Sequence, residues 1–94
     1  MPHFQIVKIK QRHKNNPDYC KAFGQHFRKL REGKGLGMRQ FALEADIEYG
    51  TLSKIERGIT NPTISTVLHL AESLGVSHSE LFDFKFPPIS RKGK

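Results

Sequence analysis

Apolar residues recur along the middle of this chain with the spacing of amphipathic helices. The first apolar stripe repeats at intervals of four, four and three residues and consists of Tyr19, Phe23, Phe27 and Leu30. Residues at such intervals lie on one face of a helix. The pattern therefore predicts a helix that begins near Pro17, with Asn16 or Asp18 as its cap. Gly33 and Gly35 are expected to end it.

Two short helices are predicted next, over about residues 38–45 and 49–57. Their expected inward residues are apolar or small, namely Phe41, Ala42, Ala45, Leu52 and Ile55. Asp46 lies where the chain must turn, because Asp tolerates the left-handed region better than most residues. Ile47 is the apolar residue of the turn, and Gly58 is expected to stop the second of the two helices.

The pattern predicts two further helices. Thr63 is suited to cap a helix over about residues 64–74. The expected inward set of that helix is Ile64, Val67, Leu68, Ala71 and Leu74. A capping box at residues 77–80 opens a short last helix that contains Leu81 and Phe82. Five helices joined by short loops indicate an all-α fold.

The chain divides by charge into three parts. Its formal net charge is +7, but residues 1–22 carry five cations and one anion, and residues 85–94 carry four cations. Residues 23–84 carry seven cations and eight anions. We expect a domain over residues 17–84, a basic N-terminal extension over 1–16 and a basic C-terminal tail over 85–94. The apolar stretch 4–9 is either a short strand or part of a poorly ordered tail.

Several classes of protein are disfavoured by composition. A single cysteine, Cys20, permits no intrachain disulfide and fits a reducing compartment. No apolar run approaches the roughly 18 residues that cross a bilayer, and no hydrophobic signal region opens the chain. We therefore expect a cytoplasmic protein. The five histidines are scattered without metal-ligand spacing. With no nucleophile–base pair in view, we expect neither metal, cofactor nor enzymatic activity.

The two central helices match the spacing of a helix-turn-helix that spans roughly Met38 to Arg57. With Met38 as the first position, apolar or small residues fall at the fourth, fifth, eighth, tenth, fifteenth and eighteenth. Two short helices that cross steeply need a small residue at the fifth position, here Ala42, where their backbones approach. The ninth position, at the tight turn, usually takes Gly. Here it is Asp46, which departs from the pattern.

Three segments together, Leu52–Gly58, Asn61–Thr63 and Leu70–Val76, resemble the Cro and phage-repressor type of helix-turn-helix, the xenobiotic-response-element family. The resemblance covers about residues 23–84. It implies a lambda-repressor-like five-helix domain that binds double-stranded DNA sequence-specifically. It also implies a transcriptional regulator, by expectation a repressor, that binds a palindromic operator as a homodimer.

The resemblance also implies which residues contact DNA. The third helix would lie in the major groove, with Tyr49, Gly50, Thr51 and Lys54 at base edges. Lys54 is suited to guanine, and the Thr51 methyl to a thymine methyl. The other implied contacts are Met38, Arg39, Gln40, Glu48, Arg57, Thr60 and Asn61. Met38 and the capping Gly37 replace the usual Gln and Ser or Thr, so Arg39 or Gln40 is expected to provide the anchor.

Two further sets follow from the resemblance and the aromatic content. Arg31 and Glu56 occupy family positions that form a partly buried ion pair, and we expect that pair to hold the first helix against the third. The surplus of aromatic surface near the C-terminus indicates a dimer interface made of Leu81, Phe82, Phe84 and Phe86.

Two alternative functions keep the same fold. In the first, the chain is an antitoxin or the controller of a restriction system and also captures a protein partner, such as a toxin, through its basic tails. In the second, it is an interaction module that has lost DNA binding. Gly37, Met38, Asp46 and Glu48 favour that second reading, because they replace usual anchors or place negative charge near the expected phosphates.

Overall fold

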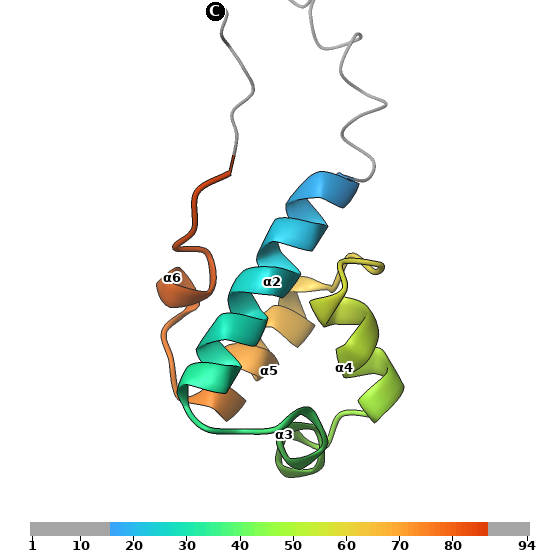
Figure 1. The fold of residues 1–94 in the computed structure, drawn as a ribbon, viewed down its shortest axis with the longest axis vertical. Coiled ribbons are helices and arrows are strands. Elements are labelled where there is room, and N and C mark those ends of the chain that lie inside the picture. Colours follow the sequence, from blue (N-terminus) through green and yellow to red (C-terminus); the bar gives the residue numbers. More distant parts are fainter. Residues whose placement is uncertain (1–15, 87–94) are drawn as a thin grey trace, which may run out of the picture.

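The computed structural model describes residues 16–86, so the strand or tail expected at 4–9 and the end of the basic C-terminal tail lie outside its range. Within residues 16–86 the protein forms five helices and no strand (Figure 1). They are α2 (Pro17–Gly33), α3 (Met38–Ala45), α4 (Tyr49–Glu56), α5 (Ile64–Leu74) and α6 (His78–Leu81). The expected all-α fold is confirmed.

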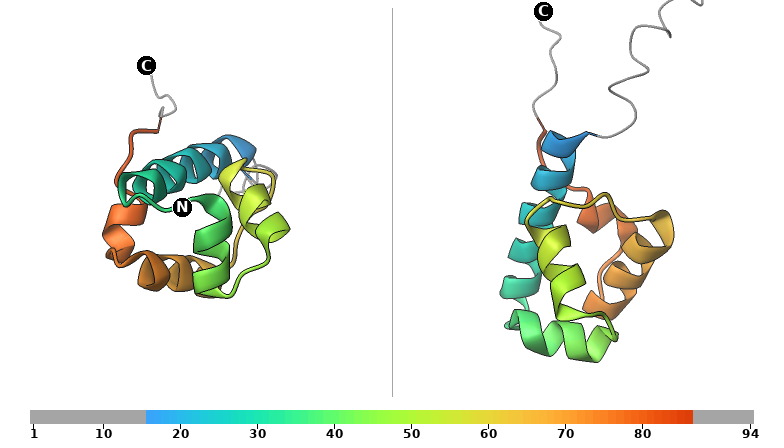
Figure 2. Two further views of the ribbon diagram at one scale, coloured as in Figure 1. Left: turned by 60° about the horizontal axis from the view of Figure 1, so that its bottom comes forward. Right: turned by 90° about the vertical axis from the view of Figure 1, so that its right-hand side faces the viewer.

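The helices close into a ring around one core. The main contacts join them in the order α2, α4, α3, α5, α6 and back to α2 (Figure 2). α3 and the start of α2 lie on opposite sides of the molecule (Figure 1). Tyr19, in the first turn of α2, packs against Phe86 with ring centroids 4.9 Å apart. The two ends of the described chain therefore meet on the side away from α3.

Local capping explains where the helices begin and end. The side chain of Asn16, rather than Asp18, caps α2 by accepting from the Tyr19 amide at 3.0 Å. Thr63 caps α5 in the same way. The capping box at residues 77–80 is formed as expected. α4 ends one residue earlier than expected, with Arg57 as its C-terminal cap.

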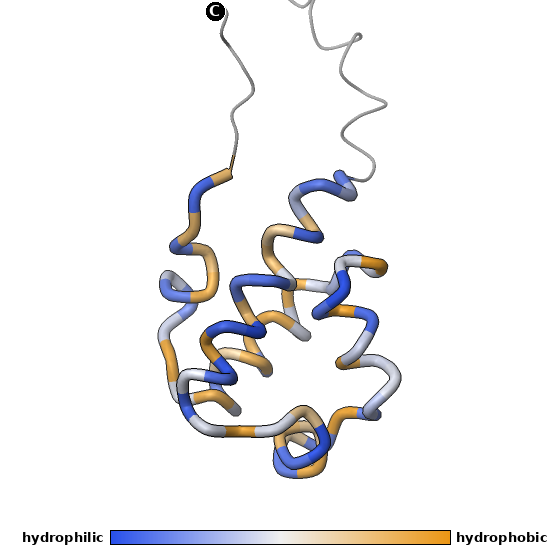
Figure 3. The backbone as a smooth tube through the Cα atoms, in the orientation of Figure 1, coloured by the Kyte–Doolittle hydropathy of each residue, from blue (hydrophilic) through white to orange (hydrophobic). Residues whose placement is uncertain are grey.

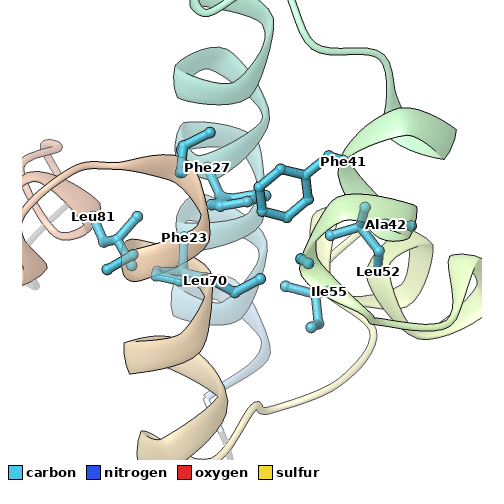
Figure 4. Packing of buried hydrophobic residues seen from close by; sticks show 11 residues of the cluster. Phe23, Phe27, Phe41, Ala42, Leu52, Ile55, Leu70 and Leu81 are labelled. Atoms are coloured by element: carbon cyan, nitrogen blue, oxygen red, sulfur yellow. The ribbon is translucent and has the colours of Figure 1, made fainter.

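The core is formed by side chains that all five helices supply (Figure 4). The largest fully buried side chains are Phe27, Phe41, Leu52, Leu70 and Leu81. Phe27 of α2 meets Phe41 of α3 edge to face, with ring centroids 5.5 Å apart. This contact ties the first helix of the helix-turn-helix to the long helix behind it.

The expected inward face of α5 is partly wrong. Ile64 is 88% exposed and Leu68 40% exposed, whereas Leu70, which was not in the expected set, is fully buried. Apolar residues run from the first turn of α5 to its last (Figure 3). The apolar arc of α5 is therefore wider than the surface that α3 and α6 cover. The helix buries the side that contains Leu70, Ala71 and Leu74 and leaves part of the arc outside.

Candidate nucleic-acid interface

α3 and α4 form a helix-turn-helix whose inner side belongs to the core. Ala42 is 3% exposed and Leu52 is fully buried, so the small residue lies where the two helices approach. Asp46 adopts the left-handed conformation, with φ 56° and ψ 49°. The Asp46 amide donates a hydrogen bond to the Leu43 carbonyl, and the Ile47 amide donates one to the Ala42 carbonyl at 2.9 Å. Asp46 thus makes the turn that usually calls for Gly.

A buried ion pair joins α2 to α4. Arg31 donates from Nε and Nη2 to the two carboxylate oxygens of Glu56, at 2.7 and 2.8 Å. Its Nη1 also donates to the Leu36 carbonyl at 2.7 Å, in the loop that leads into α3. The Glu56 hydrogen bond raises the pKa of Arg31 above its already high ordinary value. The pair expected between Arg31 and Glu56 is therefore formed, and it also holds the loop before α3.

Two glycines set how closely α4 lies against α2, and the sequence analysis missed this role for both. A Cβ on Gly24 would overlap the Ile55 carbonyl oxygen and lie 2.5 Å from that of Glu56. Gly58 has φ +74°, and a Cβ added there would overlap the backbone of Lys21. Gly58 was expected only as a helix stop. A glycine inside an otherwise strong helix was the available signal for Gly24.

The outer side of α4 presents polar groups to solvent. Tyr49, Gly50, Thr51 and Lys54 are all exposed, while Leu52 and Ile55 between them point inward. A Cβ on Gly50 would meet nothing within 4 Å, so the surface there is open. The side chain of Glu48, at the N-terminal cap, is exposed and makes no capping hydrogen bond. The structure thus leaves all four of the expected base-reading residues of α4 accessible to solvent.

The first turn of α3 lies beside the first turn of α4. The guanidinium carbon of Arg39 lies 4.5 Å from the centroid of the Tyr49 ring. Gln40 donates to Glu44 on the same helix at 3.0 Å. Met38 is partly buried and packs against the core. The cap, Gly37, supplies no side-chain hydrogen bond to the free amides of this turn.

The remaining expected contacts flank the recognition helix. Arg57 is exposed and donates to Ser53 at 3.1 Å. Thr60 is half-buried, and Asn61 is exposed in the loop that leads to α5. Arg57 is the C-terminal cap of α4, and Thr60 and Asn61 lie between α4 and α5.

The expected dimer interface needs one correction. Leu81 is fully buried within this domain's own core, so its inclusion was wrong. Phe82 is 42% exposed and lies over Phe23 with ring centroids 5.2 Å apart. Phe84 and Phe86 are half-buried against Tyr19.

Beside these aromatic residues runs an apolar groove of about 390 Å³. It is lined by Tyr19, Cys20, Phe23, Asn61, Pro62, Ile64, Val67, Leu68, His78 and Phe82. The groove therefore lies between the start of α2, the start of α5 and α6, and it includes the exposed apolar residues that α5 leaves outside the core.

Within residues 16–86, no group of three or more His, Cys, Asp or Glu side chains is arranged to hold a metal ion. In the same part of the chain, no helix has the length and hydropathy of a membrane span.

Comparison with known proteins places this arrangement among DNA-binding regulators. A family model described as helix-turn-helix matches residues 27–81. An uncharacterized HTH-type transcriptional regulator of Sinorhizobium fredii, y4dJ, is 42% identical over 64 residues, which are 68% of this chain and 83% of that protein. The control protein C.BamHI of Bacillus amyloliquefaciens is 33% identical over 63 residues, or 66% of this chain and 78% of that protein.

A solved structure agrees with these matches. The restriction-modification controller protein C.AhdI from Aeromonas hydrophila superposes with a TM-score of 0.64 at 33% sequence identity. The superposition covers 67% of this chain and 96% of that one.

Proposed function

This chain belongs to the Cro and phage-repressor type of helix-turn-helix transcriptional regulators, the xenobiotic-response-element family, and on that premise we propose that it represses transcription by binding a palindromic DNA operator as a homodimer. Its site of action is then the cytoplasm, where the operator lies. One observation carries the proposal. Tyr49, Gly50, Thr51 and Lys54 are all exposed on α4, which the Arg31–Glu56 pair joins to α2 and which Gly24 allows to pack closely against it.

The exposed face of α4 has the chemistry of sequence reading. A major groove of B-DNA, about 12 Å wide, admits an α-helix. Lys54 would donate to guanine O6 and N7, and the Thr51 methyl would touch a thymine methyl. Gly50 lets the backbone of α4 approach the bases, because no side chain stands there. Tyr49 adds an aromatic ring at the N-terminus of α4.

Phosphate contacts would come from both sides of α4. The free amides of the first turn of α3 form the positive end of a helix and suit a phosphate. Met38 contributes through its amide alone, since its side chain packs inward. Arg57, Thr60 and Asn61 offer further donors. Glu48 is the exception, since its carboxylate suits only a cytosine N4 amino group.

A palindromic operator has two half-sites about 34 Å apart, and a two-fold symmetric homodimer would place one recognition helix in each. We assign its interface to the exposed ring of Phe82, with Phe84 and Phe86 beside it. Ile64 and Leu68 extend this surface along the groove. A protruding Ile64 next to an apolar groove suits an isologous contact, in which each copy supplies both knob and groove. Sedimentation of the full chain tests this proposal, and Ile64→Ser should shift the dimer toward monomer.

A second candidate function is control of a restriction–modification system. It is favoured by the names of two proteins similar to this chain, C.BamHI and C.AhdI. In such a role the operator would precede a neighbouring restriction or methyltransferase reading frame. A neighbouring toxin gene would instead indicate an antitoxin. Inspection of the flanking genes separates these readings from a free-standing repressor.

Selection of random duplex DNA by the full-length protein tests DNA reading directly. We expect an enriched palindrome. Lys54→Ala should lower its affinity by about 5- to 150-fold for each half-site, the worth of one good base contact, and relax discrimination at one base pair in each half-site. Lys29→Ala removes the same charge from an exposed site on α2 and serves as the control. If no duplex is enriched, the chain is an interaction module on this fold.

A further inference from the structure

Arg39 and Tyr49 form a contact between the two helices of the helix-turn-helix, at their exposed ends. The guanidinium carbon lies 4.5 Å from the ring centroid, within the range of a cation–π interaction. We propose that the two side chains are one reading unit. The Tyr49 ring holds the Arg39 guanidinium so that it donates to a guanine of the operator. This inference rests on the DNA binding proposed above and names a further determinant of its specificity.

Arg39 is the residue of the first turn of α3 that is free to reach DNA. The side chain of Met38 packs against the core. Gln40 donates to Glu44 along α3. Arg39 is exposed, and within residues 16–86 no oxygen accepts a hydrogen bond from it. The anchor that Met38 lacks therefore falls to Arg39 rather than to Gln40.

The contact with Tyr49 determines where the guanidinium lies. Tyr49 is the first residue of α4, the helix that would enter the major groove. Resting on that ring, the Arg39 side chain reaches from α3 to the first residue of α4, the helix proposed to read the bases. A guanidinium over an aromatic face keeps its N–H groups available for other acceptors. Guanine O6 and N7 form the acceptor pair that suits a bidentate arginine.

Tyr49 is a positioning residue in this arrangement. Its ring restricts the Arg39 side chain before DNA arrives, which lowers the entropy lost on binding. The ring face supplies this effect, so the phenolic hydroxyl is not needed. Phe should replace Tyr49 without loss, and Leu should not.

The test measures affinity of the full chain for its selected operator and for duplexes changed at one base pair at a time. Arg39→Ala should weaken operator binding by roughly 5- to 150-fold for each half-site and abolish discrimination at one G·C pair in each. Tyr49→Leu should weaken binding by about two- to fivefold for each half-site and loosen the same pair. Tyr49→Phe keeps the ring face and should keep both affinity and discrimination. Lys29→Ala, at an exposed site on α2, should bind as the wild type does.

The double variant shows whether the two side chains act together. If Tyr49 works through Arg39, Arg39→Ala/Tyr49→Leu should bind no more weakly than Arg39→Ala. Both residues are exposed, so every variant should unfold at the wild-type denaturant midpoint, and this is checked for each.

Two results would overturn the inference. If Arg39→Ala weakens binding to all duplexes equally and lowers the salt slope by about one for each half-site, Arg39 contacts a phosphate. If Tyr49→Phe loses discrimination as Tyr49→Leu does, the hydroxyl reads DNA by itself. Lys54→Ala separates this inference from the proposed function. A palindrome that needs Lys54 but not Arg39 refutes only the reading unit, whereas no enrichment at all refutes DNA reading.

Discussion

Replacing Arg31 by Met removes one half of the buried ion pair while keeping most of the side-chain volume. The change deletes two charged hydrogen bonds to Glu56 and one to the Leu36 carbonyl. Glu56 is only 7% exposed, so its carboxylate is left without its partner and with little access to water. We expect this orphaned carboxylate, rather than the loss of attraction itself, to dominate the effect.

The expected cost is about 3–5 kcal/mol, the typical penalty for breaking a buried pair. The loss of three hydrogen bonds would by itself give a larger loss of stability, because each bond to a charged group contributes about 1.5–3 kcal/mol. Entry of water beside Glu56 keeps the cost below that sum. A domain of this size has a total stability of roughly 5–10 kcal/mol, so the variant should remain folded in water but only marginally.

Urea unfolding followed by far-UV circular dichroism measures the effect. With a slope near 1 kcal/mol per molar urea for so small a domain, the midpoint should fall by about 3–5 M. The measurement can be made at any pH from mildly acid to mildly alkaline as far as Arg31 is concerned. Because its folded pKa is raised, its contribution is complete below the unfolded pKa and disappears only in strongly alkaline solution.

The double variant Arg31→Met/Glu56→Met decides the reasoning. With both charges removed, we expect stability to return to within about 1 kcal/mol of the wild type or to exceed it. A double variant as unstable as the sum of the two single variants would refute the argument that the unpaired charge carries the cost. A single variant that loses less than about 1 kcal/mol would show that water reaches the pair freely.

Two other substitutions test the geometry and charge of the helix-turn-helix. Gly24→Ala should destabilise the domain by about 1–3 kcal/mol, because the new methyl meets backbone atoms of Ile55 and Glu56 that cannot rotate away. Gly33→Ala, where a Cβ meets nothing within 4 Å, is the matched control and should be neutral or slightly stabilising in the same urea titration. Asp46→Asn keeps a side chain that tolerates the left-handed turn and removes one negative charge, so operator affinity should rise about two- to threefold at low salt and less at high salt. Unchanged affinity at low salt, measured by fluorescence anisotropy, would place Asp46 far from the phosphates.

The helix boundaries could be predicted because capping is local. Asn16, Thr63 and Ser77 each accept from an amide three residues later, an interaction that neighbouring sequence alone decides. The left-handed turn at Asp46 was predictable for the same reason. So was the helix-turn-helix itself, since the small and apolar positions of two consecutive helices specify their crossing. The Arg31–Glu56 pair, by contrast, was expected only through family resemblance.

Tertiary packing decided the rest, because a helix with a wide apolar arc does not specify which side its neighbours will cover. α5 could have buried Leu68 or Leu70, and the positions of α3 and α6 selected Leu70. The packing of α6 against α2 and α5 likewise buries Leu81 in the core. The Arg39–Tyr49 contact also needed three dimensions. Ten positions separate the two residues, and only the crossing of α3 and α4 brings the guanidinium over the ring.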